Sequence, residues 1–294
     1  MLDISKCNLC PRECGANRSA GERGVCGEGD LARIARISLH PYEEPCISGE
    51  KGAGTVFFCG CSLGCVYCQN RAISRGTDKG KIYSAEQLAD AMLELEQMGA
   101  ASIDLVTPTH FSHVIKRALE IVKPKIKIPI VYNSSGYEKV ESLASLEGLV
   151  DVYMPDFKYS SSDIAAKYSA AADYGEIAEM ALKEMYRQVG ACKYADSGIL
   201  EKGIIIRHLV LPSCRKDSIA VLERIARTVP AEDVLISLMS QYTPDFALDS
   251  EFEELHRKIT KFEYESVVKT AEKLNFDGFV QSRSSAEKIY TPDF

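Results

Sequence analysis

The sequence has no long apolar run, although 46% of its 294 residues are hydrophobic. No stretch approaches the roughly 18 consecutive apolar residues that a membrane-spanning helix needs. The first ten residues, MLDISKCNLC, contain neither the basic region nor the apolar region of a secretory signal peptide. We therefore expect a cytoplasmic protein with no membrane partner.

Runs of basic residues are also missing. The formal net charge is −7, and the sequence contains no run of five or more Lys or Arg residues. A nucleic-acid-binding protein usually has a basic footprint, and an anionic membrane surface attracts the same kind of patch. The composition therefore argues against nucleic acid or a lipid surface as the main partner.

Cysteine, in contrast, is abundant. Nine of the eleven cysteines precede residue 70, and the rest of the chain has the composition of an ordinary α/β core. In a reducing cytoplasm, closely spaced cysteines are more often ligands or catalytic groups than disulfide partners. We therefore divide the chain into a cysteine-rich, metal-binding N-terminal segment, residues 1–50, and a core domain, residues 51–294.

Apolar, β-rich runs alternate with helical patterns along the core. The predicted strands are residues 55–58, 103–106, 128–132, 150–154, 204–209, 234–238 and 278–280. The predicted helices are residues 84–98, 112–122, 176–189, 218–228 and 262–274. This alternation predicts a parallel sheet, either open and doubly wound or closed into a partial or complete barrel. Both arrangements place the active site at the carboxyl ends of the strands.

The segment CGCSLGCVYCQN, residues 59–70, directly follows the first of these strands. Cys61, Cys65 and Cys68 form the pattern C-x3-C-x2-C. Thiolates are the soft ligands that suit iron–sulfur clusters, and a four-iron cluster usually takes four of them. Three thiolates would hold three irons and leave the fourth iron for a small molecule.

This spacing, with Tyr67 just before the last cysteine, resembles the radical S-adenosylmethionine (SAM) enzymes. The resemblance implies a partial (β/α)6-type TIM-like barrel and a 4Fe-4S cluster whose open iron is chelated by the amino and carboxylate groups of SAM. One electron from the cluster would then cleave the sulfonium and give a 5′-deoxyadenosyl radical, which abstracts hydrogen from a substrate.

Later segments resemble the same superfamily, in particular the pyruvate formate-lyase activating enzyme and its uncharacterised relatives. These segments are YNSSGY, MPDFK and IIIRHLVLPS, together with CNLCPRECGANR, VTPTH and MSQY. By this resemblance, the residues that bind SAM are Tyr67, Asn133, Ser135, Asp156, Lys158 and Arg207.

The sequence departs from the superfamily after the second predicted strand. Thr107-Pro-Thr109-His110 stands where a Gly-Gly-Glu-like stretch commonly binds the amino group of SAM. We therefore expect the hydroxyls of Thr107 and Thr109 and nearby carbonyls to hold that group. His110 has two open interpretations: a catalytic residue near the radical or the substrate, or a hydrogen-bonded structural side chain.

Cys59 raises the alternative of a zinc knuckle with four cysteine ligands. A fourth thiolate would block the iron that SAM requires, and the ligand loop is complete without it. We therefore predict that Cys59 is a small buried side chain and not a ligand.

A second group, Cys7, Cys10, Cys14 and Cys26, lies in the N-terminal segment. We predict a second metal site there, either zinc or another iron–sulfur cluster, because the segment has few apolar residues to stabilise it. Unliganded thiols are the alternative, and Cys46 could replace any of the four.

The leading function is a radical SAM oxidoreductase that takes its electron from a partner such as flavodoxin or ferredoxin. The resemblance points to a glycine of a glycyl-radical enzyme polypeptide as substrate. Modification of another protein or of a small molecule, and a non-catalytic iron–sulfur or zinc scaffold, are the alternatives.

Overall fold

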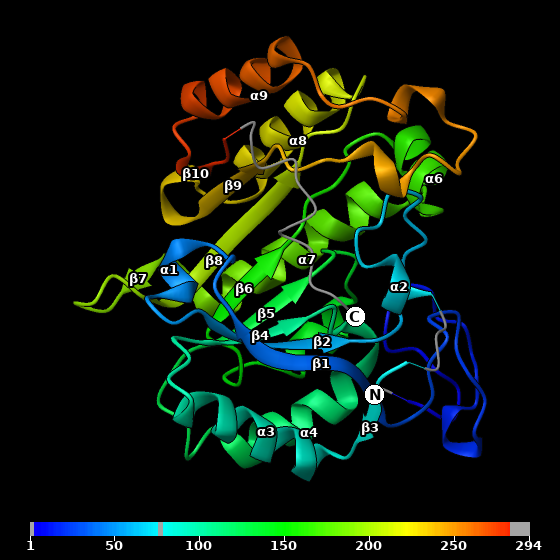
Figure 1. Cartoon of the computed structure of the whole chain (residues 1–294), viewed down its shortest axis with the longest axis vertical. Helices are drawn as coiled ribbons and strands as arrows, with labels where there is room; N and C mark the ends of the chain where they lie inside the picture. Colours follow the sequence, from blue (N-terminus) through cyan, green and yellow to red (C-terminus); the bar gives the residue numbers. More distant parts are fainter. Residues whose placement is uncertain (1–2, 76–78, 283–294) are drawn as a thin grey trace.

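The structure, a computed structural model, describes residues 3–75 and 79–282 (Figure 1). Its strands are β1 (Ala32–His40), β2 (Ala53–Phe58), β3 (Lys81–Tyr83), β4 (Ile103–Val106), β5 (Ile130–Ser134), β6 (Val152–Pro155), β7 (Lys193–Tyr194), β8 (Leu200–Leu209), β9 (Leu235–Met239) and β10 (Asp277–Val280). Its α-helices are α1 (Pro45–Ser48), α2 (Arg71–Ser74), α3 (Ala85–Gln97), α4 (Ser112–Val122), α5 (Val140–Ala144), α6 (Ser162–Ser169), α7 (Tyr174–Val189), α8 (Arg215–Thr228) and α9 (Lys261–Lys273). Short 3₁₀ helices lie at Arg18–Ala20, Thr109–Phe111, Ala231–Asp233, Pro244–Phe246 and Glu253–Leu255.

A single curled sheet organises the molecule. Its strand order is β10-β9-β8-β6-β5-β4-β2-β1-β3, with β7 paired to β8 outside this path. Neighbours from β2 to β10 are parallel, whereas β1 is antiparallel to both β2 and β3. Within the described residues β3 and β10 are the unpaired ends of this path, so the barrel is partial. The predicted α/β, partial TIM-like fold is confirmed.

The outer helices follow the sequence pattern closely. Helix α3 begins at a capping box in which Ser84 and Gln87 satisfy each other's backbone N–H groups. It ends before Gly99, whose φ of +92° favours glycine. Its apolar face, on Leu88, Met92 and Leu95, is buried in the main core between sheet and helices. Figure 1 shows α3 and α4 on one side of the curled sheet and α8 and α9 beyond its other end.

Helix α1 closes the barrel interior at the amino ends of the parallel strands. Its residues Cys46 and Ile47 are buried in a second, smaller core. The inward-facing residues that pack against them are Val131, Val152, Met154, Leu200, Ile205 and Leu235. The chain reaches this end because β1 runs antiparallel to β2. The segment 41–44 therefore lies at the opposite end of the barrel from the loop that follows β2.

Strand β1 was missed by the sequence analysis, which assigned it to the cysteine-rich segment. It pairs with β2 from Ile34 to His40. The division predicted at residue 50 thus separates two strands of one sheet. Strand β3, also missed, adds to the free side of β1.

The N-terminal lobe, defined here as residues 3–31, packs at the carboxyl ends of the strands (Figure 1). Arg12 Nε donates a hydrogen bond to the carbonyl oxygen of Ser62 at 2.8 Å. Arg18, only 1% exposed, donates from Nη1 to the carbonyl oxygen of His110 at 2.7 Å. These two arginine bonds fix the lobe against the loop that follows β2 and against the segment that follows β4.

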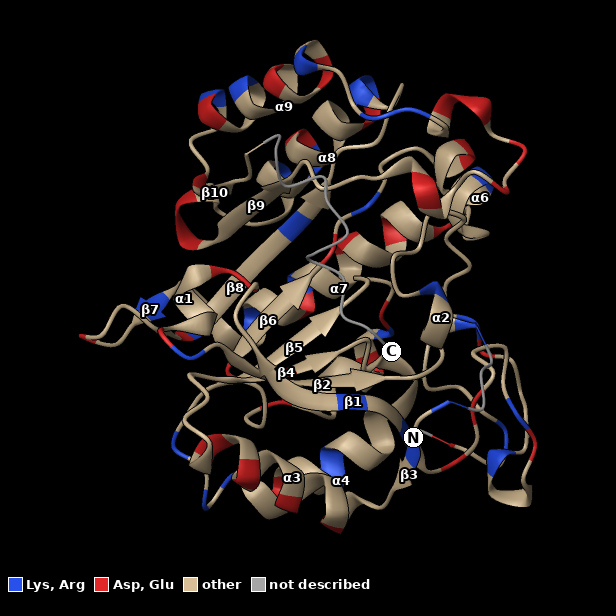
Figure 2. Ribbon diagram, viewed as in Figure 1, with Lys and Arg blue, Asp and Glu red and all other residues tan. Residues whose placement is uncertain are grey.

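None of the helices in the described part of the chain combines the length and the apolarity needed to cross a membrane. Figure 2 shows Lys and Arg interspersed with Asp and Glu on the outer surface, for example along α9. Among the residues drawn in colour there, no long basic stripe is visible.

Candidate active site

The cluster loop, defined here as residues 59–70, begins with a sharp turn at the carboxyl end of β2. Gly60 has φ +79°, and a Cβ there would lie 2.7 Å from the carbonyl oxygen of Cys26. Only glycine fits this close approach without strain. The turn directs Cys61, Cys65 and Cys68 into a cavity of about 320 Å³. Cavities of this size hold small-molecule ligands.

Cys59 lies outside that cavity. Its side chain is fully buried and packs with Phe57, Ile73 and Val106. Its Sγ donates a hydrogen bond to the carbonyl oxygen of Lys79 at 3.4 Å. The cavity is therefore lined by the three cysteines of the C-x3-C-x2-C pattern and not by Cys59.

Polar groups at the ends of α2 and α6 hold the cluster loop in place. Ser169 Oγ, at the end of α6, donates to Cys65 Sγ at 2.9 Å. Arg75 Nη2 donates to the carbonyl oxygen of Cys65 at 2.8 Å, and Cys68 Sγ lies 3.4 Å from Ser74 Oγ. The loop geometry is thus set by contacts to α2 and α6 as well as by the N-terminal lobe.

A chain of buried hydroxyls extends this support. Tyr67 OH is hydrogen-bonded to Tyr159 OH, and Tyr159 OH lies 2.8 Å from Ser169 Oγ. Burial, reinforced by the neighbouring Tyr159, raises the pKa of Tyr67 well above its usual value. Both tyrosines therefore stay neutral, and a continuous line of hydrogen bonds runs from Tyr67 to Cys65.

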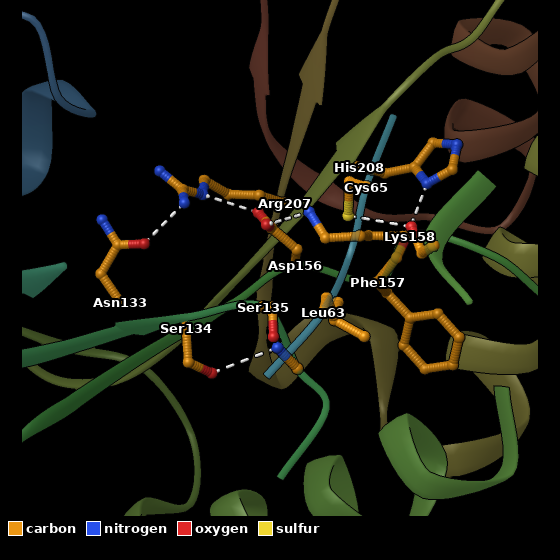
Figure 3. Close-up of polar contacts among 12 residues, drawn as sticks. Leu63, Cys65, Asn133, Ser134, Ser135, Asp156, Phe157, Lys158, Arg207 and His208 are labelled. Atoms are coloured by element: carbon orange, nitrogen blue, oxygen red, sulfur yellow. Dashed lines mark hydrogen bonds and ion pairs between the residues drawn. The ribbon is translucent and has the colours of Figure 1, made fainter. Parts of the chain in front are cut away.

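The charged centre of the cavity consists of Asp156, Lys158 and Arg207, at the ends of β6 and β8 (Figure 3). Lys158 Nζ donates to Asp156 Oδ2 at 2.6 Å, and Arg207 Nε donates to Asp156 Oδ1 at 3.2 Å. Arg207 Nη2 also donates to Asn133 Oδ1 at 2.6 Å. Burial alone would raise the pKa of Asp156, but Lys158 and Arg207 outweigh it and the pKa is lowered. Asp156 is therefore ionised between two cations.

Lys158 is close enough to the cluster loop to act on it electrostatically. Burial opposes its charge, but Asp156 and then Cys65 raise its pKa, so it stays cationic. Its own backbone N–H donates to Tyr174 OH at 2.9 Å. The neighbouring residue of Arg207, His208, points the other way: its Nδ1 donates to the carbonyl oxygen of Phe157 at 2.7 Å.

Only part of the TPTH segment, residues 107–110, lines the cavity. Thr107 lines the cavity and has φ +61°, an uncommon conformation for a β-branched residue. Thr109 and His110 do not line it. Thr109 donates to the buried carboxyl of Glu138, and His110 Nε2 donates to the carbonyl oxygen of Cys59 at 2.7 Å. Burial lowers the pKa of His110 to about 3. His110 is thus a neutral side chain behind the cluster loop, which matches its structural interpretation.

The four N-terminal cysteines lie together, away from the cavity. A Cβ on Gly24 would lie 3.2 Å from Cys14 Sγ and 3.4 Å from Cys26 Sγ. Cys7 and Cys26 act electrostatically on Cys10, although burial is the main cause that raises the pKa of Cys10 to about 12. In the part of the chain that the structure describes, no group of three or more Cys, His, Asp or Glu is arranged to hold a metal ion, and this applies to both cysteine groups.

Glu43 and Glu44, which the sequence analysis missed, line the end of the cavity opposite the cysteines. Glu43 Oε2 lies 3.5 Å from Arg207 Nη1, and Glu43 is 12% exposed. A signal for the strand that precedes them was the alternation of Ala35, Ile37 and Leu39 with Arg36 and Ser38, which is typical of a half-buried strand. The remaining predicted SAM-binding residues, Asn133 and Ser135, also line the cavity.

Comparison with known proteins agrees with this geometry. A sequence model of the Radical SAM superfamily matches residues 55–185. An uncharacterized protein of Methanocaldococcus jannaschii is 29% identical over 286 residues, which cover 93% of this chain and 76% of that protein.

Three solved structures share the fold at low sequence identity. SuiB of Streptococcus suis, bound to its precursor peptide SuiA, has a TM-score of 0.52 and 13% identity over 76% of this chain; the match spans only 46% of SuiB. A radical SAM methyltransferase from Sphaerobacter thermophilus has a TM-score of 0.53 and 14% identity, covering 83% of this chain and 68% of that one. Spore photoproduct lyase has a TM-score of 0.53 and 11% identity, covering 80% and 78%.

The segment matched by the family model begins in β2, contains the whole cluster loop and extends into α7. It therefore includes Cys61, Cys65 and Cys68 together with the Asp156–Lys158 pair. Residues 55–185 of this chain therefore match the sequence pattern of a radical SAM superfamily domain.

Proposed function

We propose that this protein is a radical SAM enzyme that binds one 4Fe-4S cluster through Cys61, Cys65 and Cys68. The observation behind this proposal is that these three cysteines line a cavity together with polar side chains, while Cys59 is buried elsewhere. A cluster bound there would supply one electron to SAM and so generate a 5′-deoxyadenosyl radical. The protein's own part is to bind, orient and exclude water.

The donor set fits such a cluster. Three thiols of one short loop are soft ligands, and the remaining lining of the cavity contains no further cysteine among the described residues. Burial raises the pKa of Cys65, while the positive charge of Lys158 lowers it in part. Cluster binding requires thiolates, so Lys158 favours the form of Cys65 that binds iron.

The polar side chains of the cavity suit the functional groups of SAM. Lys158, a cation beside Cys65, is placed to pair with a carboxylate. Asp156 offers carboxylate acceptors for the ribose hydroxyls, and Ser135 offers a hydroxyl. Thr107, at the end of a neighbouring strand, offers a hydroxyl and has a strained backbone. Arg207, whose guanidinium already binds Asp156 and Asn133, holds these acceptors in position.

The substrate proposal follows from the resemblance in the sequence. We propose a flavodoxin or ferredoxin as electron donor and a glycine of a glycyl-radical enzyme as the site of hydrogen abstraction. Another protein or a small molecule is the second candidate, because fold and cofactor do not determine the substrate.

A metal at Cys7, Cys10, Cys14 and Cys26 is a separate proposal. It rests on the closeness of Cys14 and Cys26 to one position, Gly24, and on the sparse apolar content of the lobe. Zinc and a second cluster both remain candidates. Metal analysis of a Cys61/Cys65/Cys68→Ala variant tests it: zinc or iron should remain bound, whereas metal-free protein would contradict the proposal.

The enzyme proposal is tested by anaerobic incubation of the cluster-loaded protein with SAM and dithionite. We expect 5′-deoxyadenosine to form, as measured by liquid chromatography and mass spectrometry. Cys65→Ala should abolish it, because the cluster loses one of only three ligands. Cys192→Ala, whose thiol packs in the small core beside α1, is the matched control and should retain it.

Absence of 5′-deoxyadenosine from the loaded wild-type protein would contradict the proposal. So would its undiminished formation by Cys65→Ala. A non-catalytic scaffold would give neither product nor a response of the cluster to SAM.

A further inference from the structure

The cavity floor, defined here as the lining residues Glu43 and Glu44 together with Asp104, which is close enough to act electrostatically on Glu43, is acidic. Glu43 and Glu44 precede α1, which closes the amino end of the barrel. Asp104 lies on β4 two residues before the cavity-lining Val106 and thus faces the barrel interior. Asn133 Nδ2 donates to Asp104 Oδ2 at 3.1 Å, which ties Asp104 to the cavity wall.

Too few cations face these carboxyls to neutralise them. Among the described residues that line the cavity, the basic side chains are Lys158 and Arg207, apart from His40, whose pKa burial lowers. Lys158 is bonded to Asp156, and Arg207 divides its hydrogen bonds between Asp156, Asn133 and the more distant Glu43. Of these two cations, only Arg207 contacts the cavity floor, through its interaction with Glu43.

Two floor oxygens have no partner in the described protein. Asp104 is fully buried, and its Oδ1 accepts no hydrogen bond. Glu44 Oε2 is likewise shielded from solvent and accepts none. An unsatisfied buried acceptor costs free energy, and buried polar groups in native proteins are nearly always paired. A donor is thus missing at the place where carboxyls outnumber cations.

Apolar groups line the cavity as well. Phe57, Val106, Met239 and Phe279 line its wall. Such a wall suits the carbon skeleton of an organic molecule better than a hydrated inorganic ion.

We propose that the substrate of this enzyme has a positively charged nitrogen group, an ammonium or a guanidinium, that binds at the cavity floor between Glu43 and Glu44, above Asp104. The inference rests on the proposed function, because it defines what occupies the cavity beyond SAM. Charge-assisted hydrogen bonds to carboxylates are the strong kind and would fix the substrate at the end of the cavity opposite the cysteines. Its body would then extend along the apolar wall toward the cluster loop.

The titration behaviour of the floor agrees with this assignment. Burial raises the pKa of Asp104 to about 7. Burial and then the negative charge of Asp104 raise the pKa of Glu43 well above its usual value, against the opposing effect of Arg207. A cationic group would supply the counter-charge that these carboxyls lack.

The test uses the anaerobic, cluster-loaded protein in the presence of SAM. The probe is n-butylammonium, and its affinity is measured by ligand-observed NMR beside butan-1-ol and butyrate, which have the same carbon chain without the positive charge. We expect n-butylammonium to bind about 10-fold or more tightly than either control, since one charged hydrogen bond is sufficient for such a ratio. Glu44→Gln and Glu43→Gln should weaken it by about 10-fold. Glu223→Gln, on the exposed face of α8, should not.

Equal binding of the three probes, or an unchanged affinity in both Gln variants, would overturn the proposal. Displacement of n-butylammonium by an equal concentration of Mg²⁺ would also overturn it, in favour of a metal site. Cluster absorbance and circular dichroism of the same samples show whether each variant is folded. If SAM alters the cluster signal of the wild-type protein while the probes bind equally, only the substrate proposal fails; if SAM has no effect, the proposed function fails.

Discussion

Ser169 donates a hydrogen bond to the sulfur of Cys65, with 2.9 Å between Oγ and Sγ. Hydrogen bonds to cluster ligands help to set the reduction potential, because they stabilise the more negative, reduced state. Ser169→Ala should therefore lower the potential of the cluster, while the three cysteine ligands stay in place. A redox titration followed by electron paramagnetic resonance (EPR) measures the shift.

The matched control for this variant is Ser266→Ala, because Ser266 Oγ donates only to a carbonyl oxygen of its own helix, at 2.6 Å. It should leave the potential unchanged. A potential in Ser169→Ala that equals the wild-type value would show that the Ser169–Cys65 contact does not influence the cluster.

Removing the Arg207 guanidinium should destabilise the fold. Arg207→Met would leave Glu43 and Asn133 without their donor and Asp156 with Lys158 alone. Loss of one partner of a buried ion pair costs about 3–5 kcal/mol of unfolding free energy, because the remaining charge stays desolvated. Anaerobic urea denaturation followed by circular dichroism measures this loss.

Arg117→Met serves as the control, since Arg117 forms an exposed ion pair with Glu86. Exposed pairs contribute about 0–1 kcal/mol. If both variants lost the same small amount, the charged centre of the cavity would be no more important for stability than a surface pair.

Because of the proton on Glu138, the free energy of unfolding should fall as the pH rises from about 4.5 to about 7. Burial raises the pKa of Glu138 from 4.5 to about 7, although the hydrogen bond from Thr109 and the nearby hydroxyls of Ser134 and Tyr132 lower it in part. In this interval the folded protein keeps the proton and the unfolded chain does not, so each pH unit reduces the unfolding free energy by about 1.4 kcal/mol. Glu138→Gln lacks this titration.

The measurement is the Tm of wild type and of Glu138→Gln at several pH values, by circular dichroism. The wild-type Tm should fall relative to that of the variant between pH 5 and pH 7. Parallel curves for the two proteins would mean that the folded protein does not hold this proton.

Cys59 should be dispensable for cluster binding. Its side chain packs with Phe57, Ile73 and Val106 outside the cavity. We expect Cys59→Ser to assemble a four-iron cluster and to cleave SAM, with some loss of stability because a hydroxyl replaces a buried thiol. Iron analysis and 5′-deoxyadenosine formation check this; loss of both would identify Cys59 as a ligand.

The sequence predicted the parts of the fold that have strong local signals. β4 and α4 coincide with their predicted ranges, and α3 begins within one residue of its predicted start, at a capping box formed by Ser84 and Gln87. The cluster loop was also evident, because the spacing of its cysteines follows from the binding of a cluster and can be read without knowledge of the packing. Arg207, and not His208, lines the cavity, as alternation along a strand predicts.

The cavity floor could not be predicted in the same way. Glu43 and Glu44 reach the cavity only because β1 runs antiparallel to β2 and returns the chain to the amino end of the barrel. His110 illustrates the reverse problem: it follows β4 but its ring turns behind the cluster loop to Cys59. Tertiary contacts between segments far apart in sequence decide both placements, and local pattern does not encode them.

The central claim is that this chain ligates three irons and leaves the fourth to SAM. Electron–nuclear double resonance on the reduced cluster, with SAM that is isotopically labelled at its amino nitrogen, tests this most directly. We predict a coupling between the labelled nitrogen and the cluster, in wild type and in Cys59→Ser alike. An intact cluster that shows no such coupling at saturating SAM would contradict the account.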